Sequence, residues 1–283
     1  MPFEDRVVNC AAYLQLFPIY QKSFYEHSYG SVPNKGSLKA VLKLQEWLKR
    51  TSRKKEKWYI AKLDIAKFFF RIPVEVQLRE LAKPLDDEDM MWFLKKAIIC
   101  DGRPFGLPLD CEDVSTAERI SGIGMQVGSL ISQMTANVVL TPLDHFIKRE
   151  LRAPYYVRYM DDIILLLPSK SEAWEDIAAV DEYLQTYLGL QLNQKTAVMP
   201  LNTGVEFVGR RVWPGRITIR KQTSLNMKRH LRYIMEHYSQ GELPLQYCTA
   251  SMQSYLGMLQ HTDCFALKKK IIEDFKLMKR GAK

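Results

Sequence analysis

The sequence predicts an α+β fold with a helical C-terminal region. Three observations lead to this class. Amphipathic segments with helical spacing occur along the chain, short apolar runs typical of strands lie between them, and from Ser224 onward only helical spacing remains. The chain has 283 residues and 47% hydrophobic content, which is enough to bury a large core. This size is compatible with one large domain or with two to three closely packed subdomains.

The first half of the chain is predicted to combine helices with one strand and two loops. Residues 37–50 carry apolar side chains at helical spacing above a lysine face, which predicts an amphipathic helix. A basic loop at 51–57 leads into a strand at 58–64, which ends at an aspartate followed by aromatic residues. A second helix is predicted at 73–81. Residues 101–128, rich in glycine and proline, are predicted to be mostly loop or hairpin.

The second half begins with a predicted helix at 132–151, in which Pro142 is expected to cause a bend or lie near a turn. Two short apolar runs, 155–159 and 163–167, are separated by Met-Asp-Asp and predict a hairpin. A further helix is expected at 174–188. The remaining elements are three short strands and three helices, predicted at 190–193, 205–212, 216–220, from 224 onward, 251–259 and 267–277.

Positive charge is concentrated in two regions of a chain whose formal charge is +9. Residues 35–57 hold nine Lys or Arg against two Glu, and residues 220–283 hold twelve against five acids. Such basic regions favour a polyanionic partner, nucleic acid above all. A basic surface that serves only solubility is the alternative.

The sequence shows no signal peptide, and no apolar run reaches the roughly 18 residues that a membrane span needs. We therefore expect a cytoplasmic protein without membrane contact. Five cysteines show neither paired nor metal-like spacing and are expected to be reduced thiols: Cys10, Cys100, Cys111, Cys248 and Cys264.

Two adjacent carboxylates, Asp161 and Asp162, stand at the tip of the predicted hairpin. Their charges repel unless a cation lies between them, and hard oxygen ligands suit Mg²⁺ better than a soft metal. A third acid is needed to hold two ions about 4 Å apart, the arrangement used for in-line phosphoryl transfer. Asp64 ends a separate apolar strand, so a neighbouring strand could bring it beside the hairpin. The alternative is a plain turn or helix cap together with a strand-terminating acid.

The order of several short motifs resembles that of the reverse transcriptases over nearly the whole chain. Residues 159–162 (YMDD) match the YxDD box, and residues 64–69 (DIAKFF) match the first catalytic box. Upstream, residues 5–8 (DRVV) and residues 28–30 (SYG) with 35–36 (KG) resemble two fingers motifs. Downstream, residues 192–196 (LNQKT) resemble the motif whose lysine lies near the polyphosphate, and residues 207–209 (FVG) resemble the primer-grip hairpin. Residues 254–257 (SYLG) with His261 resemble the bacterial thumb.

The resemblance implies a right-hand polymerase fold of fingers, palm and thumb. The expected boundaries are an N-terminally incomplete fingers region at 1–57, a palm at 58–219 and a helical thumb at 220–283. A fingers segment at about 73–130 is expected to be inserted in the palm.

The resemblance also implies an RNA-directed DNA polymerase that uses two Mg²⁺ ions, with Mn²⁺ as a substitute. The ions would be held by Asp64, Asp161, Asp162 and the backbone carbonyl of Ile65. One would activate the primer 3′-hydroxyl, and the other would be carried on the triphosphate. Lys195 would neutralise the leaving pyrophosphate or donate a proton to it, with a plain surface lysine as the alternative.

Further residues are assigned to the substrates by the same resemblance. Phe69, five residues past Asp64, falls at the steric gate that favours dNTPs over rNTPs, with an ordinary core phenylalanine as the alternative. The other expected nucleotide contacts are Val127, Gly128, Gln133, Arg6 and Lys35. The expected primer and template contacts are Tyr159, Met160, Phe207, Gly209, Lys228, Arg229 and Arg232. A solvated helix face is the alternative for the last three.

Residues 124–137 (GMQVGSLISQMTAN) indicate which type of reverse transcriptase the chain resembles most. Most reverse transcriptases have Pro-Gln-Gly and then Ser-Pro here, whereas this chain has Gln-Val-Gly and then Ser-Gln. This pattern is similar to the error-prone reverse transcriptases of diversity-generating retroelements, which miscopy adenines; neutral drift is the alternative. Val127 lacks an amide, and losing a contact worth roughly 1 kcal/mol would loosen nucleotide discrimination several-fold. The implied partners are an RNA template, a DNA or RNA primer, dNTPs and an accessory retroelement protein.

Two other interpretations stay open. One is a group II intron-like or abortive-infection reverse transcriptase, although the Ser132-Gln133 pair argues against the intron version. The other is a nucleic-acid-binding remnant of the polymerase fold that does not polymerise. The complete set of three aspartates argues against a remnant, because a binding module has no need to keep repelling charges together.

Overall fold

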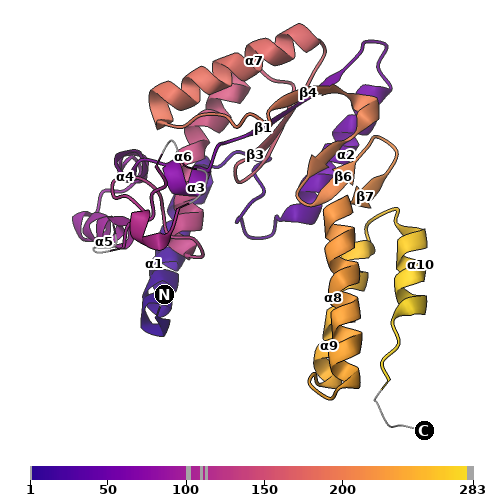
Figure 1. Cartoon of the computed structure of the whole chain (residues 1–283). Helices are drawn as coiled ribbons and strands as arrows, with labels where there is room; N and C mark the ends of the chain where they lie inside the picture. The colour runs from indigo at the N-terminus through magenta and orange to yellow at the C-terminus, as the bar shows by residue number, and fades with distance from the viewer. Residues whose placement is uncertain (1, 100–102, 109–110, 112–113, 279–283) are drawn as a thin grey trace. The chain divides into compact units, whose positions relative to one another are not determined.

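The computed structural model describes residues 2–99, 103–108, 111 and 114–278, and the chain divides into two compact units (Figure 1). The first unit consists of residues 1–40 and 55–200, and the second consists of residues 41–54 and 201–283. The helix α2 (Ser37–Ser52) contributes its first turn to the first unit and the rest to the second.

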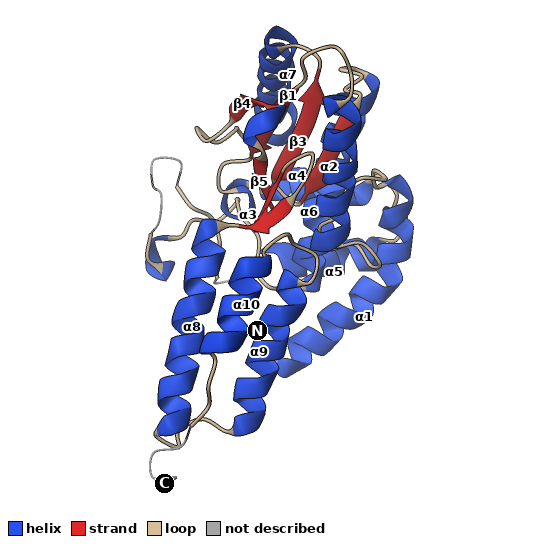
Figure 2. Ribbon diagram, turned by 90° about the vertical axis from the view of Figure 1, so that its right-hand side faces the viewer, coloured by secondary structure: helices blue, strands red, loops and turns tan. Residues whose placement is uncertain are grey.

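A four-stranded antiparallel sheet forms the centre of the first unit, with the strand order β2-β3-β1-β4. Its strands are β1 (Tyr59–Asp64), β2 (Tyr155–Tyr159), β3 (Asp162–Leu167) and β4 (Ala197–Pro200). Helices α6 (Leu130–Arg149) and α7 (Lys170–Tyr183) cover one face of this sheet (Figure 2). A π-helical segment, Leu184–Leu188, extends α7.

The two faces of the sheet differ in character because side chains alternate along each strand. Ala61, Leu63, Ile163 and Leu165 are fully buried and form the main core together with α6 and α7. The opposite face carries the polar residues of β1. Residues 163–167 are buried on both faces, which explains why the second strand of the hairpin is apolar without alternation.

A second core fills the helical part of the first unit. It lies among α1 (Phe3–Tyr20), α4 (Val74–Ala82), α5 (Glu88–Ile99) and the first half of α6. Its most deeply buried members are Leu16, Tyr20, Leu81, Leu94 and Met134. Helix α6 therefore contributes to both cores, which fixes it beneath the strands that carry the carboxylates.

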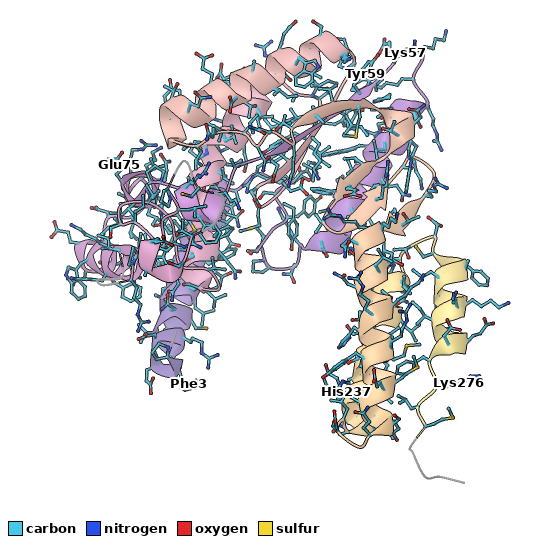
Figure 3. The ribbon with its side chains drawn as sticks, viewed as in Figure 1. Phe3, Lys57, Tyr59, Glu75, His237 and Lys276 are labelled. Atoms are coloured by element: carbon cyan, nitrogen blue, oxygen red, sulfur yellow. The ribbon has the colours of Figure 1, made fainter. Side chains whose placement is uncertain are left out.

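The second unit has its own small sheet and core. Strands β5 (Val205–Phe207), β6 (Arg210–Val212) and β7 (Ile217–Ile219) form a meander, followed by α8 (Lys221–Ser239), α9 (Leu245–Leu259) and α10 (Phe265–Asp274). Met227, Leu231, Leu259 and Ile271 pack together between these helices. His237 lies in the last turn of α8 and pairs with Glu242 (Figure 3).

Most predicted elements are confirmed, with two corrections among the strands. The strand predicted at 205–212 is wrong: Val208 and Gly209 have φ of 47° and 73° and form a two-residue turn between β5 and β6. The strand predicted at 190–193 is also wrong, since only an isolated bridge joins Leu192 to Ile65. The Leu192 N–H donates to Asp181 Oδ1 at 2.8 Å instead of continuing a ladder.

Apart from single 3₁₀ turns, four of the described helices and strands were not predicted from the sequence. They are α1, α3 (Phe68–Arg71), α5 and β4. Exposed apolar side chains such as Val8 and Leu14 on α1 and Trp92 on α5 blur the apolar stripe that marks an amphipathic helix. The segment 101–128 is irregular where it is described, apart from a short 3₁₀ turn, Thr116–Glu118, and isolated bridges.

Two expectations drawn from composition can be compared with the structure. Cys10, Cys111, Cys248 and Cys264 are free thiols, whereas Cys100 lies outside the described residues. In the part of the chain that the structure describes, every helix is too short or too polar to cross a bilayer.

Candidate active site

The sheet brings the three predicted carboxylates to one place. Asp64 is the last residue of β1 and Asp162 the first of β3, and the two are direct cross-strand partners. Directly opposed side chains point to the same face of a sheet, with Cβ atoms about 4.5–5.5 Å apart. Asp161 lies in the two-residue loop that follows Tyr159, which itself pairs with Asp162. The predicted hairpin and its neighbouring strand are therefore confirmed.

The carboxylates of this cluster repel one another, and Asp161 is also partly removed from water. Burial raises the pKa of the Asp161 carboxyl, and the charge of Asp64 raises it further. Lys62, two residues before Asp64 on the same face of β1, lies 3.5 Å from Asp162 Oδ1 and offsets part of the negative charge. Among the described residues, no three acidic, histidine or cysteine side chains already converge as a metal cage.

The donor chemistry of the cluster nevertheless fits a hard divalent cation. Three carboxylates gathered at one end of a sheet offer the oxygen ligands that Mg²⁺ prefers. The Ala66 N–H donates to the Gln191 carbonyl, and the Asn193 N–H donates to the Asp64 carbonyl, at 2.9 and 2.7 Å. These bonds flank Ile65, so the Ile65 carbonyl takes no part in the bridge to Leu192. Its expected role as a metal ligand stays a prediction.

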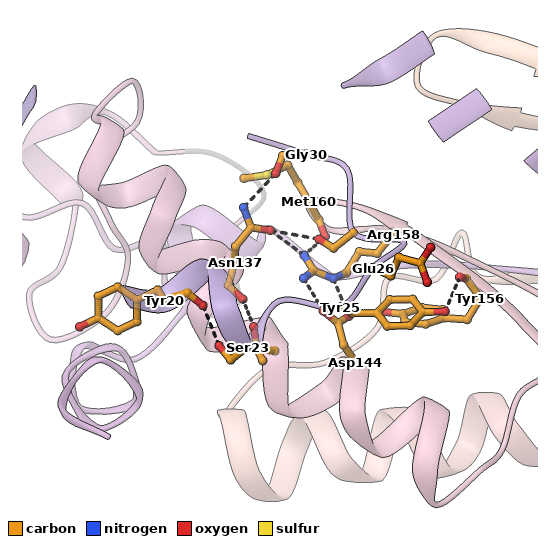
Figure 4. Close-up of polar contacts among 12 residues, drawn as sticks. Tyr20, Ser23, Tyr25, Glu26, Gly30, Asn137, Asp144, Tyr156, Arg158 and Met160 are labelled. Atoms are coloured by element: carbon orange, nitrogen blue, oxygen red, sulfur yellow. Dashed lines mark hydrogen bonds and ion pairs between the residues drawn. The ribbon is translucent and has the colours of Figure 1, made fainter. Parts of the chain in front are cut away.

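The loop of Met160 and Asp161 rests on a buried polar network that was not predicted from the sequence (Figure 4). Arg158 and Asp144 are fully buried and form a two-pronged ion pair, with Nε–Oδ1 and Nη2–Oδ2 distances of 2.7 and 2.6 Å. Arg158 Nη1 also donates to the Met160 carbonyl at 3.1 Å. The sequence feature that could have indicated this network is a charge at an expected core position. Arg158 interrupts an apolar-leaning strand, and Asp144 lies in an apolar stretch of helix.

The predicted steric gate lies beside the loop that distinguishes this chain. Phe68 is fully buried in the main core, whereas the ring of Phe69 is only partly buried at its edge. The Phe69 carbonyl accepts a hydrogen bond from the Met125 N–H at 2.8 Å. This bond holds residues 124–128 next to Phe69. Val127 is 65% exposed, and Gly128 has a φ of 88° with nothing within 4 Å of the position that a Cβ would occupy.

The other three predicted nucleotide contacts, Gln133, Lys35 and Arg6, lie outside the loop at 124–128. The side-chain carbonyl of Gln133 accepts a hydrogen bond from Ser31 Oγ at 3.0 Å. The Lys35 ammonium donates to the carbonyls of Glu26 and Ser28 at 2.6 and 3.0 Å, and burial lowers its pKa. Lys35 therefore holds its own loop together in this structure. Arg6 is exposed on α1, with its guanidinium over the ring of Phe3.

Lys195 is exposed in the loop before β4. Its backbone N–H donates to Asn193 Oδ1 at 3.0 Å, and the Asn193 N–H in turn donates to the Asp64 carbonyl. The backbone of this loop is thus tied to the end of β1 at the carboxylate cluster.

The remaining predicted contacts belong to the second unit. Phe207 is buried, and Gly209 in the adjoining turn is exposed, with its carbonyl accepting from the Arg220 N–H at 3.1 Å. On α8, Arg229 and Arg232 are exposed and Lys228 is partly buried. Lys228 and Arg232 line a pocket between α8 and α10, together with Leu231, Met235, Lys270, Ile271, Asp274 and Phe275.

Known proteins are similar to this chain over most of its length. The putative COX1/OXI3 intron 2 protein of Saccharomyces cerevisiae is 21% identical over 72% of this chain and 29% of that protein. Protein YkfC of Escherichia coli is 23% identical over 74% of this chain and 60% of that protein. The chain thus spans less than two thirds of the length of either relative.

Two structures of telomerase from Candida tropicalis have a similar fold. The apo enzyme matches with a TM-score of 0.55 and 12% identity, over 94% of this chain and 54% of that one. Telomerase in complex with a TWJ fragment of telomeric RNA also matches at 0.55, with 14% identity over 93% and 47% of the two chains. The likeness bears on the fold alone and agrees with the right-hand polymerase fold that the motifs imply. Residues 1–212 match the model of the reverse transcriptase (RNA-dependent DNA polymerase) family, and the chain belongs to that family, as its motifs predict.

Proposed function

We propose that this chain is an RNA-directed DNA polymerase that extends a DNA or RNA primer with dNTPs on an RNA template. The observation that carries the proposal is the pairing of Asp64 with Asp162 across β1 and β3, with Asp161 in the adjoining loop. Membership of the reverse transcriptase family supports the same reaction class. A binding protein would gain nothing from two like charges placed directly opposite each other, since such pairs destabilise a sheet.

The roles of the residues follow from their positions. Asp64, Asp161, Asp162 and the Ile65 carbonyl would hold two Mg²⁺ ions, which supply Lewis-acid activation of the primer hydroxyl and charge stabilisation at the phosphates. Phe69 would exclude the 2′-hydroxyl of rNTPs. Lys195, on the loop tied to the end of β1, would stabilise the leaving pyrophosphate.

Other assignments are part of the same proposal. Tyr159 and Met160 would contact the primer end, and Phe207 and Gly209 would form the primer grip. Lys228, Arg229 and Arg232 would bind phosphates of the hybrid. We retain 1–57 as fingers, 58–219 as palm with the inserted segment at about 73–130, and 220–283 as thumb.

Primer extension tests the polymerase proposal. A labelled primer on a poly(rA) template and on a mixed-sequence RNA template is incubated with dNTPs and Mg²⁺, using the wild type and Asp161→Asn. Extension by the wild type that disappears in Asp161→Asn is the expected result. Binding of the template by both proteins without extension by either would overturn the proposal in favour of a non-polymerising nucleic-acid-binding protein.

We further propose that the enzyme belongs to the error-prone type found in diversity-generating retroelements. The support is Val127, which is exposed in the loop held beside Phe69 and lacks the usual amide, together with Gln133 on α6, which replaces the usual proline. An accessory retroelement protein would be a further partner.

Product sequencing tests this subtype. Misincorporation concentrated opposite template adenines is expected, and Val127→Gln should reduce it several-fold because an amide contact worth roughly 1 kcal/mol is restored. Gly128 and Gln133 would remain in place in that variant. A spectrum without adenine bias, measured in the presence of the native accessory factor, would favour a group II intron-like or abortive-infection enzyme instead.

A further inference from the structure

Arg158 contacts the loop between β2 and β3 from the helix-covered side of the sheet. Arg158 lies opposite Ile163 in the ladder, so its side chain points to the helix-covered face, away from Asp64 and Asp162. Its Nε and Nη2 donate to Asp144 on α6, and Tyr156 adds a 2.5 Å hydrogen bond to the same carboxylate. A buried charge is tolerated only when its donors are satisfied in this way.

The third nitrogen of the guanidinium reaches the catalytic loop. Arg158 Nη1 donates to the Met160 carbonyl at 3.1 Å and to Asn137 Oδ1 at 3.2 Å. Met160 has a φ of 56°, a left-handed conformation that is unfavourable for a residue with a side chain and that surrounding contacts must maintain. The hydrogen bond from Arg158 is one such contact. The backbone of Met160 leads directly into Asp161.

Asn137 extends the network to a second segment of the chain. Its amide nitrogen donates to the Gly30 carbonyl at 2.9 Å, while its amide oxygen accepts from Arg158 (Figure 4). Gly30 lies against the loop itself: a Cβ on Gly30 would be 2.6 Å from Met160 Cγ and 2.7 Å from Met160 N. Asn137 therefore connects Gly30 and Arg158, two residues that both contact Met160.

We propose that Asn137 and Arg158 are positioning residues, which fix the conformation of the loop at Met160 and so the place of Asp161 beside Asp64. Both side chains are fully buried, which leaves neither at the surface. The segment 28–31 and the catalytic loop are coupled through Asn137, so that a shift of one is transmitted to the other. The expected effect on activity rests on the proposed polymerase function, whereas the effect on the loop conformation rests on the hydrogen bonds of Asn137 and Arg158.

The matched variants Asn137→Ala and Thr141→Val test the inference. Thr141 lies one turn along the same helix, is buried, and donates to the Asn137 carbonyl at 2.9 Å. Thr141→Val thus removes a buried hydrogen bond of α6 without touching the loop. Asn137→Asp is a third variant, which keeps the acceptor for Arg158 but loses the donor to Gly30, and it serves if the alanine variant does not fold.

Two readouts are compared among folded variants. Hydrogen exchange of the amides of residues 159–162 should accelerate in Asn137→Ala and stay at the wild-type rate in Thr141→Val. The Mg²⁺ concentration for half-maximal extension should rise roughly 10- to 100-fold in Asn137→Ala, as for other residues that orient metal ligands, with little change in the KM for dNTP. A loss shared equally by Asn137→Ala and Thr141→Val in both readouts would overturn the inference.

Failure of the proposed function would look different. If the wild type does not extend a primer, hydrogen exchange decides the conformational claim by itself. Faster exchange in Asn137→Ala alone would support the positioning role without polymerase activity. Unchanged exchange of residues 159–162 in Asn137→Ala and Asn137→Asp would contradict it.

Discussion

Asp64 and Asp162 are direct partners in the antiparallel ladder of β1 and β3. Two like charges in this relationship destabilise a sheet, and residues 163–167 show that the same strand is otherwise a fully apolar core strand. The nearby ammonium of Lys62 offsets the repulsion only in part, at 3.5 Å from Asp162. The pair is explained if the sheet exists to present these carboxylates to divalent cations.

Lys62→Gln should tighten the binding of Mg²⁺. The ammonium of Lys62 occupies the same negative potential as an incoming cation, so its removal takes away a competitor. A partly exposed ion pair is worth up to about 1 kcal/mol, which corresponds to a two- to fivefold lower Mg²⁺ requirement in primer extension. The variant should also be less stable than the wild type without Mg²⁺. A higher Mg²⁺ requirement would show that Lys62 assists the metal site instead.

Gly30→Ala should impair activity because a Cβ there cannot fit beside Met160. The nearest approach of 2.6 Å involves the side chain, but the backbone nitrogen of Met160 lies at 2.7 Å and cannot move freely. We expect a loss of about 1–3 kcal/mol in the free energy of unfolding by urea, together with at least a tenfold slower extension. Gly257→Ala is the control, since nothing lies within 4 Å of its Cβ position and alanine favours the helix. Equal activity of the two variants would contradict the tight packing.

Phe69→Ala should relax the choice between dNTPs and rNTPs. Removing the ring opens the space in which a 2′-hydroxyl would lie, and the ratio of kcat/KM for dNTP over rNTP should fall roughly 10- to 100-fold. Phe70→Ala provides the comparison, because the Phe70 ring lies against the Arg119 guanidinium, at 4.6 Å from its centroid. If both variants keep the wild-type ratio, Phe69 is only a residue of the core edge.

The stability of the first unit should respond to pH through Asp176 on α7. Burial, together with the charges of Glu172 and Glu175, raises the pKa of Asp176 from 3.8 to about 6. The proton on a group of raised pKa stabilises the fold fully below pH 3.8, and this contribution is lost as pH rises through 6. Asp176→Asn should therefore raise the free energy of unfolding at pH 7.5 by about 1 kcal/mol, after allowance for screening by solvent.

The difference between the wild type and Asp176→Asn should shrink as pH falls through 6 toward 4. Urea unfolding at a series of pH values between 4.5 and 7.5 measures it. An asparagine variant that is less stable than the wild type at pH 7.5 would show that the Asp176 carboxylate is stabilised in the fold and would contradict the raised pKa.

The placement of the three carboxylates could be predicted from the sequence because its signals are local. The strand ending at Asp64 and the hairpin around Asp161 are marked by apolar runs that stop at acids, and the family order of motifs placed them together. Local signals also sufficed for α2, α4, α8, α9 and α10.

The remaining features depend on tertiary contacts that periodicity does not encode. The apolar pattern at 205–212 predicted one continuous strand, and only the resemblance to the primer-grip hairpin indicated a turn at Val208. A β-branched residue at positive φ is unfavourable by itself and is maintained by the surrounding fold. The buried network joins Gly30 to Asn137, 107 positions further along the chain, and joins Asn137 and Asp144 of α6 to Arg158. Only the fold shows that a buried arginine and a buried asparagine converge on the loop before Asp161.

Single-turnover incorporation of one dNTP on a primed RNA template tests the central claim most directly. The wild type, Asp64→Asn and the control Asp176→Asn, which is an acid-to-amide change away from the carboxylate cluster, are compared across a Mg²⁺ titration. We predict Mg²⁺-dependent incorporation by the wild type and the control, and a rate lower by roughly 10³-fold or more in Asp64→Asn, since a lost metal ligand removes several kcal/mol of transition-state stabilisation. Incorporation by Asp64→Asn within a few-fold of the wild type would contradict the assignment of the cross-strand carboxylates as the metal-binding centre.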